Sequence, residues 1–141
     1  MKPDCLLDTS LLIDLEEEVA EDVAGPATRT LAALRGRRLW LSVVTVAEFL
    51  EAAEDATAAA RALGGYRLQT IGWSEAQRCA HHQARAARRL GENDAWQVAL
   101  ALGGGLTLVG HDRAFEGRPG LDYRDHRKLA SHALPQSPAQ T

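Results

Sequence analysis

Residues 5–15 read CLLDTSLLIDL, a stretch that joins a short apolar run to a helical pattern. The apolar run at residues 5–7 is typical of a buried parallel strand. Asp8, Thr9 and Ser10 then favour a turn into a helix, because the leucines that follow recur at helical spacing. A strand that leads directly into a helix predicts one βα unit of a parallel sheet.

The same alternation recurs along the rest of the chain. Further strands are expected at residues 39–41, 66–71, 106–109 and, shorter, 121–123. Helices are expected at about residues 19–34 (with a break at 25–26), 46–54, 56–63, 74–90 and 93–102. These patterns predict a single α/β domain over residues 1–128, with a mainly parallel sheet of four to five strands and right-handed crossovers. Residues 129–141 are expected to form a mobile tail.

Length and composition narrow the class of protein. The chain has 141 residues, 45% of them hydrophobic, which suffices for one core. No segment approaches the roughly 18 apolar residues of a membrane span. The first residues lack the apolar stretch and cleavage site of a signal peptide, so the cytoplasm is the expected compartment. Cys5 and Cys79 are expected to be core thiols, since two cysteines make neither a disulfide framework nor a zinc signature.

The net charge of -3 is unevenly distributed. Residues 1–60 hold twelve acids and five bases, whereas residues 61–141 hold eleven bases and seven acids. The helix expected from Ser74, with Gln77 closing a capping box, gathers basic and imidazole side chains on one face: Arg78, His81, His82, Arg85, Arg88 and Arg89. This face is suited to phosphates, although a solvated helix surface is the slightly better supported interpretation. Single histidines elsewhere are expected at the surface, namely His111, His126 and His132.

Four carboxylates stand at the expected junctions between elements, and each has a structural explanation. Asp8 is a suitable N-cap. Glu48 lies three residues after Thr45, as in a capping box. Asp94 opens a helix, where its charge complements the helix dipole. Asp112 follows a strand and suits a turn. Taken singly, each acid is better explained by its structural role.

Taken together, the four acids predict a binding site. Ligands of open parallel sheets gather at the carboxyl ends of the strands, where Asp8 and Asp112 are expected. Carboxylates drawn into one cleft raise one another's pKa values unless a cation neutralises them. Oxygen ligands without clustered histidine or cysteine indicate Mg²⁺ or Mn²⁺ rather than zinc. Such an ion is suited to phosphate chemistry.

Four sequence blocks resemble a known family: LLDTSLLIDL, SVVTVAEFL, NDAWQVALAL and LVGHDRAFEGRPGL. Their order and spacing, over about residues 5–123, are similar to those of the PIN domain and specifically of VapC-type toxin ribonucleases. The resemblance implies a three-layer α/β/α PIN-like fold and an endoribonuclease that depends on Mg²⁺ or Mn²⁺. It also implies an RNA substrate, a VapB-like antitoxin partner and a homodimer.

The resemblance assigns metal-binding and catalytic roles to four acids: Asp8, Glu48, Asp94 and Asp112. It implies that the substrate side of the site includes Thr9, Ser10 and Asn93, to which we add Arg113 because it directly follows Asp112. Two residues depart from the family pattern. Gly110 stands where the family often has a hydroxyl residue, and Ala114 stands where many relatives have an acid. These departures make Asp8 and Asp94 the firmer members of the set.

Other functions stay open at this point. A PIN-like module that binds RNA or protein without cutting is favoured by Gly110 and Ala114. Aspartyl-phosphate chemistry also uses acids at strand ends, but the only lysines, Lys2 and Lys128, follow no core strand. The apolar side chains of residues 11–15 and 46–50 are candidates for a dimer or antitoxin surface.

Overall fold

The computed structural model describes residues 2–128. Its strands form one five-stranded, all-parallel sheet in the order β3-β2-β1-β4-β5. The strands are β1 (Cys5–Leu7), β2 (Leu39–Ser42), β3 (Arg67–Gln69), β4 (Thr107–Gly110) and β5 (Tyr123–Asp125). The predicted mainly parallel sheet of four to five strands is therefore confirmed, with the last strand slightly later than expected.

The strand order reverses beside β1. The chain passes from β1 outward to β2 and β3, and then returns to place β4 on the other side of β1. Leu7 pairs with Val109, and the Asp8 N–H donates to the Val109 carbonyl at 2.8 Å. The ends of β1 and β4 thus lie side by side at a topological switch point, where open parallel sheets bind ligands.

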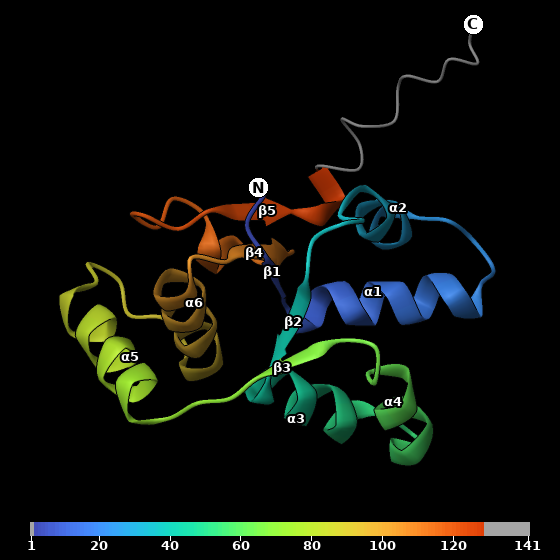
Figure 1. Cartoon of the computed structure of the whole chain (residues 1–141), viewed down its shortest axis with the longest axis horizontal. Helices are drawn as coiled ribbons and strands as arrows, with labels where there is room; N and C mark the ends of the chain where they lie inside the picture. The colour runs from blue at the N-terminus through green and yellow to red at the C-terminus, as the bar shows by residue number, and fades with distance from the viewer. Residues whose placement is uncertain (1, 129–141) are drawn as a thin grey trace, which may run out of the picture.

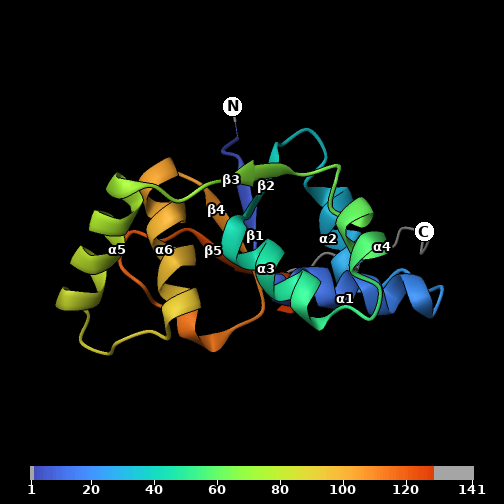
Figure 2. The ribbon, with the colours of Figure 1, turned by 90° about the horizontal axis from the view of Figure 1, so that it is seen from below.

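Helices cover both faces of the sheet (Figures 1 and 2). One face carries α1 (Thr9–Ala20), α2 (Pro26–Ala33), α3 (Val43–Ala52) and α4 (Ala56–Ala62); the other carries α5 (Trp73–Arg85) and α6 (Glu92–Gly104). Side chains of β1 alternate between the two cores, because Leu7 packs with α1 and α3 whereas Leu6 packs with α6. The three-layer prediction is confirmed.

An acid on α1 fixes the start of α2. The N-cap of α2 is Gly25, which has no side chain to accept the orphan amide hydrogens. Glu18 supplies the missing acceptors, because its carboxylate accepts from the N–H groups of Ala27 at 2.9 Å and Thr28 at 2.8 Å. A Cβ at position 25 would lie 2.6 Å from Cδ of Glu18, so glycine is required for this approach.

Several predicted helix boundaries were wrong. Residues 19–20 belong to α1 and residues 21–25 are not helical, so the helix expected at about residues 19–34 is reduced to α2. The N-cap of α5 is Gly72, whose N–H donates to Oε1 of Glu75 at 2.6 Å. This half of a capping box lies two residues before the box predicted for Ser74 and Gln77. The same helix ends at Arg85 rather than near residue 90. Residues 86–91 form a loop instead, which removes Arg88 and Arg89 from the predicted basic helix face.

One prediction about the surface was wrong, and another holds only in part. Of the apolar side chains expected to form a partner surface, Leu11, Leu12 and Phe49 are buried in the core, whereas the following are only partly buried: Leu15, Val46 and Leu50. His126 is fully buried, and its Nε2 lies 2.7 Å from Oδ2 of Asp14. His132 and the expected tail at residues 129–141 lie outside the described residues.

The helices also bear on membrane spanning. Across residues 2–128, every helix is too short or too polar to traverse a bilayer.

Candidate metal centre

Asp8 caps a helix and is also one of four acids that we call the acid cluster: Asp8, Glu48, Asp94 and Asp112. It is the N-cap of α1, and its Oδ2 accepts from the backbone N–H of Ser10 at 3.3 Å and from the Ser10 hydroxyl at 2.7 Å. Its Oδ1 accepts from Nε2 of Gln97 at 3.1 Å. The residue is only 7% exposed. The predicted cap is present, and it fixes the carboxylate at the switch point.

Glu48 is not a capping residue. Ser42, at the end of β2, is the N-cap of α3 and its hydroxyl accepts from the Thr45 N–H at 3.0 Å, which displaces the box predicted for Thr45 and Glu48. Glu48 instead accepts from the Thr9 hydroxyl at 2.7 Å and from Nδ2 of Asn93 at 2.8 Å. These two bonds tie α3 to α1 and to α6 at the edge of the sheet.

Asp94 and Asp112 reach the same place from α6 and from the end of β4. Asp94 lies in the first turn of α6 and is half-buried. Asp112 caps the short 3₁₀ helix η1 (Arg113–Phe115), with Oδ1 accepting from the Ala114 N–H at 2.9 Å. The Asp112 N–H donates to the hydroxyl of Tyr123 at 3.0 Å, so β5 also holds this residue in place.

The electrostatics show that the four acids act on one another. The pKa of Asp94 is raised to about 6, first by burial and then by the charges of Asp112 and Asp8, by a hydrogen bond shared with Asp112 and by the charge of Glu48. Three acids from distant parts of the sequence therefore disfavour the charge on the fourth. The structure brings together all four carboxylates singled out in the sequence.

Gly110 allows a close approach rather than leaving a gap. A Cβ at this position would lie 2.6 Å from Cβ of Asp8 and 3.0 Å from the Ser10 hydroxyl oxygen. That hydroxyl donates to Asp8 and accepts from the His111 N–H at 2.8 Å. A hydroxyl is thus present beside Asp8, but it comes from α1 instead of from β4.

Two functional candidates escaped the sequence analysis. Gln97 is 1% exposed, and its Nε2 donates to the Thr45 hydroxyl at 2.9 Å as well as to Asp8. Its Oε1 has no partner within residues 2–128. Thr45 also lies 3.3 Å from the Ser42 hydroxyl and 3.4 Å from that of Thr9. The sequence does contain a sign of this role, because Gln97 is the one polar residue in the otherwise apolar run at residues 95–102 of α6.

The remaining predicted site residues divide into two groups. Thr9, Ser10 and Asn93 each bond one of the acids. Arg113 is exposed, and it lines a cavity whose lining includes none of the four acids. His111, expected at the surface, is partly buried with Nδ1 3.0 Å from Asp125.

The four acids fit a hard cation by their chemistry. As the side chains stand, residues 2–128 contain no group of three His, Cys, Asp or Glu placed to hold an ion. The donors are nevertheless all carboxylate oxygens, which Mg²⁺ and Mn²⁺ prefer. The pKa of Asp94 is raised first by burial and then by repulsion from Asp112 and Asp8, and a divalent cation would relieve that repulsion. Small side-chain rotations away from their present partners would be required.

Comparison with known proteins points in the same direction. The PIN domain family matches residues 5–121. A toxin–antitoxin complex from Klebsiella pneumoniae is similar, with a TM-score of 0.71, 24% identity and coverage of 87% of this chain and 98% of that one. DNA-bound VapBC from Salmonella typhimurium has a TM-score of 0.69 and 19% identity, with coverage of 89% of this chain and 99% of that one. FitAcB from Neisseria gonorrhoeae has a TM-score of 0.62 and 17% identity, with coverage of 90% of this chain and 93% of that one. The search of curated proteins gave no match.

Proposed function

The chain belongs to the PIN domain family, and we propose that it is a metal-dependent endoribonuclease, the toxin of a VapBC-type toxin–antitoxin pair. The observation that carries this proposal is the convergence of acids from four elements at one sheet edge, where side chains of α1 and α6 bond Asp8 and Glu48. Burial, and then the charges of Asp112 and Asp8, raise the pKa of Asp94 there to about 6. Carboxylates with raised pKa values cluster at functional sites, because their mutual repulsion destabilises the fold unless a bound ligand neutralises it.

The residues divide into ligands and supports. Mg²⁺ or Mn²⁺ would be held by Asp8, Glu48, Asp94 and Asp112. When bound, the ion would neutralise the scissile phosphate and activate water. Thr9 and Asn93 orient Glu48 through the bonds described above, while Ser10 and Gln97 orient Asp8.

Without a cation, the pKa of Asp94 is about 6, first because of burial and then because of the charges of Asp112 and Asp8. A bound divalent cation would favour the ionised carboxylate and so keep it available as a ligand. In-line attack of water on the phosphodiester would leave 3′-hydroxyl and 5′-phosphate ends, as the resemblance to the toxins implies.

The proposed partners are an antitoxin and a second copy of the chain. The similar structure from Klebsiella pneumoniae is described as a toxin–antitoxin complex, and one from Mycobacterium tuberculosis as a member of the VapBC family of toxin–antitoxin systems, which supports an antitoxin here. A basic antitoxin side chain placed among the acids would inhibit the enzyme by occupying the place of the cation. The proposed compartment is the cytoplasm, where RNA and antitoxin would both be available.

Cleavage of cellular RNA tests the nuclease. The wild-type chain, Asp8→Asn and Asp94→Asn are incubated with total RNA in Mg²⁺, in Mn²⁺ and in EDTA, and the new ends are mapped. We expect metal-dependent cuts by the wild type alone. Glu92→Gln is the matched control, because Glu92 is an exposed acid of the same helical turn as Asp94. Undiminished cleavage by both aspartate variants would overturn the assignment.

One observation favours a second function, a PIN-like module that binds RNA or protein without cutting. Within residues 2–128 the acids are not placed to hold an ion as they stand. Calorimetric titration with Mn²⁺ separates the two functions. A nuclease gives saturable binding that Asp94→Asn weakens, whereas a binding module gives neither metal binding nor cleavage.

A further inference from the structure

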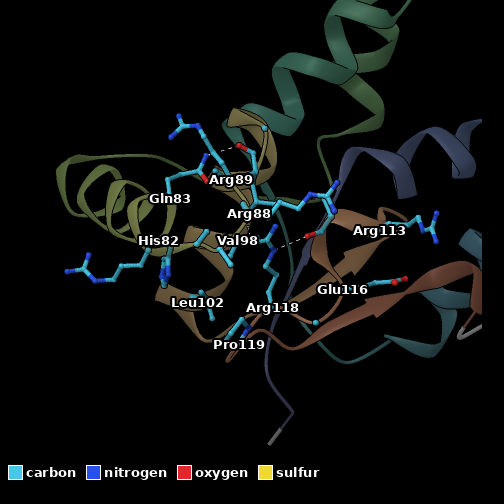
Figure 3. Close-up of a pocket in the computed structure, with 18 residues that line it drawn as sticks. His82, Gln83, Arg88, Arg89, Val98, Leu102, Arg113, Glu116, Arg118 and Pro119 are labelled. Atoms are coloured by element: carbon cyan, nitrogen blue, oxygen red, sulfur yellow. Dashed lines mark hydrogen bonds between the residues drawn. The ribbon is translucent and has the colours of Figure 1, made fainter.

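A cavity borders two of the elements that also carry acids of the cluster, α6 and the segment after β4 (Figure 3). It opens between the end of α5, the loop at residues 86–91, one face of α6 and the segment at residues 113–119. Its volume is about 1290 Å³. Small-molecule pockets usually occupy about 300–1,000 Å³. The cavity therefore has room for a stretch of polymer.

The lining is strongly basic. Five arginines border the cavity: Arg85, Arg88, Arg89, Arg113 and Arg118. Among the described residues that line it, the only acid is Glu116, which pairs with Nζ of Lys128 at 3.1 Å. Within residues 2–128, the arginines at positions 85, 88, 89 and 113 form no salt bridge. An anionic ligand would thus meet several cations that are not already neutralised.

The loop that carries two of these arginines is held in place from both sides. The side-chain amide of Gln83 donates to the Leu90 carbonyl at 2.8 Å and accepts from the Leu90 N–H at 3.0 Å. Arg118 donates to the carbonyls of Arg88 at 3.2 Å and Ala114 at 3.0 Å, which joins the loop to the segment after β4 (Figure 3). The cavity is therefore built before any ligand arrives, which lowers the ordering cost of binding.

The floor of the cavity is apolar, unlike its rim. Leu90, Val98 and Leu102 line it, and the first two are buried side chains of the α6 core. A ligand that presents charge along a backbone and flat apolar groups to one side would satisfy both surfaces. A single-stranded nucleic acid has that chemistry, since arginine binds its phosphates and the flat faces of its bases can pack on apolar side chains or on the planes of the arginine guanidinium groups.

Two residues that line the cavity directly follow two of the acids in the sequence. Ala95, on the lining, follows Asp94, and Arg113, also on the lining, follows Asp112. A polyanion that approaches the four carboxylates is repelled by them. Cations on the adjoining surface would offset this repulsion and hold the strand beside the metal centre.

We propose that this arginine-lined cavity binds the backbone of single-stranded RNA next to the scissile bond. The proposal rests on the proposed function, because it names where the substrate of that nuclease is held. It assigns the binding of phosphates to Arg88, Arg89 and Arg113, and it leaves Arg118 the role of joining the walls.

Binding of a labelled single-stranded RNA tests the cavity. The full chain carries Asp94→Asn so that bound RNA stays intact, and fluorescence anisotropy is recorded at several salt concentrations in Mg²⁺ and in EDTA. The double variant Arg88→Gln/Arg89→Gln should weaken binding by roughly tenfold at low salt. Its plot of log affinity against log salt should flatten by about 0.7 for each phosphate that the variant no longer neutralises. Arg113→Gln should act in the same direction by a smaller factor.

The matched control is Arg35→Gln/Arg61→Gln, which removes the same charge from two exposed arginines outside the lining. Equal weakening by both doubles would reduce the effect to net charge and overturn the proposal, as would unchanged binding by the cavity variant. Displacement of the RNA by an acidic peptide at lower concentration than by unlabelled RNA would reassign the cavity to a protein partner.

The two proposals fail differently. Arginine-dependent RNA binding by a wild-type chain that cuts nothing would leave the cavity standing and remove the nuclease. Metal-dependent cleavage by a chain whose RNA binding does not depend on these arginines would support the nuclease and overturn the proposal for the cavity.

Discussion

Glu18 and Asp8 are equally buried, each 7% exposed, but they belong to opposite kinds of site. Burial pushes the pKa of Glu18 upward, yet the hydrogen bonds from Thr28 and Ala27 outweigh it and hold the pKa below its usual value. Burial also raises the pKa of Asp94, but there the charges of Asp112 and Asp8 add to the effect instead of opposing it, and the pKa is about 6. Burial alone therefore does not identify a functional acid. The groups that face the acid do.

Asp14 extends the comparison on the structural side. Burial raises its pKa, but hydrogen bonds from Arg127 and His126 lower it further than burial raises it. Both nitrogen partners lie close, at 2.9 Å for Nε of Arg127 and 2.7 Å for Nε2 of His126. These acids stabilise the fold by being ionised, whereas the acid cluster at the switch point gives up stability for a potential ligand.

The largest expected effect is on catalysis at the acid cluster. Asp94→Asn should lower the rate of RNA cleavage by at least about 100-fold, because even the loss of groups that support metal ligands costs about 10- to 100-fold. Its melting temperature should not fall, since the substitution removes repulsion among the acids. Cleavage kinetics and thermal melts on one preparation check both. A lower melting temperature for Asp94→Asn would show that Asp94, like Glu18, stabilises the fold, and would contradict the contrast drawn between the two acids.

Gln97→Met should come next in size. The variant keeps the volume of the side chain but loses the bonds to Asp8 and Thr45. We expect Mn²⁺ affinity by calorimetry to fall about 10- to 100-fold. The free energy of unfolding should also fall, by about 1–3 kcal/mol, because the buried Oδ1 of Asp8 loses its hydrogen-bond donor. Gln77→Met, at an exposed position of α5, is the control. Unchanged metal affinity would exclude a positioning role.

Glu18→Ala tests the structural side of the comparison. Loss of the acceptors for Ala27 and Thr28 should reduce the free energy of unfolding by about 1–3 kcal/mol. The rate of cleavage per folded molecule should stay the same. Glu16→Ala is the matched control, because Glu16 is an exposed neighbour on the same helix. Denaturant unfolding measures the effect, and equal losses in both variants would remove the capping role.

The smallest effect concerns pH. Asp94 binds its proton more tightly in the folded chain, so its contribution to stability is lost as pH rises from about 4 to about 6. Asp14 and Glu18, with lowered pKa values, act oppositely and lose their contribution as pH falls below their usual range. Asp94→Asn should therefore abolish the loss of stability that Asp94 causes between about pH 4 and 6. In the wild type, Mg²⁺ should restore this stability at about pH 7 by binding the folded chain. Melting temperatures across this range, with and without Mg²⁺, measure it.

The sequence predicted the strand ends better than the side-chain partners. Asp8 and Asp112 could be placed together because the ends of parallel strands share an edge. The bond between Glu48 and Thr9 could not, since Ser42 and Thr45 are both acceptable caps and the choice depends on where β2 ends. A run of three glutamates gives no sign that Glu18 alone reaches α2, because the loop at residues 21–25 decides that contact.

The pairing of β1 with β4 also sets when the cluster can exist during synthesis. The hydroxyl of Ser10 and the N–H of His111 that bonds it are 101 residues apart. Contacts of such long range form late, because a large loop must close first. A nascent chain that has not yet released β4 from the ribosome carries Asp8, Glu48 and Asp94 without the strand that gathers them. Such a chain would lack the assembled acid cluster until β4 has left the ribosome and paired with β1.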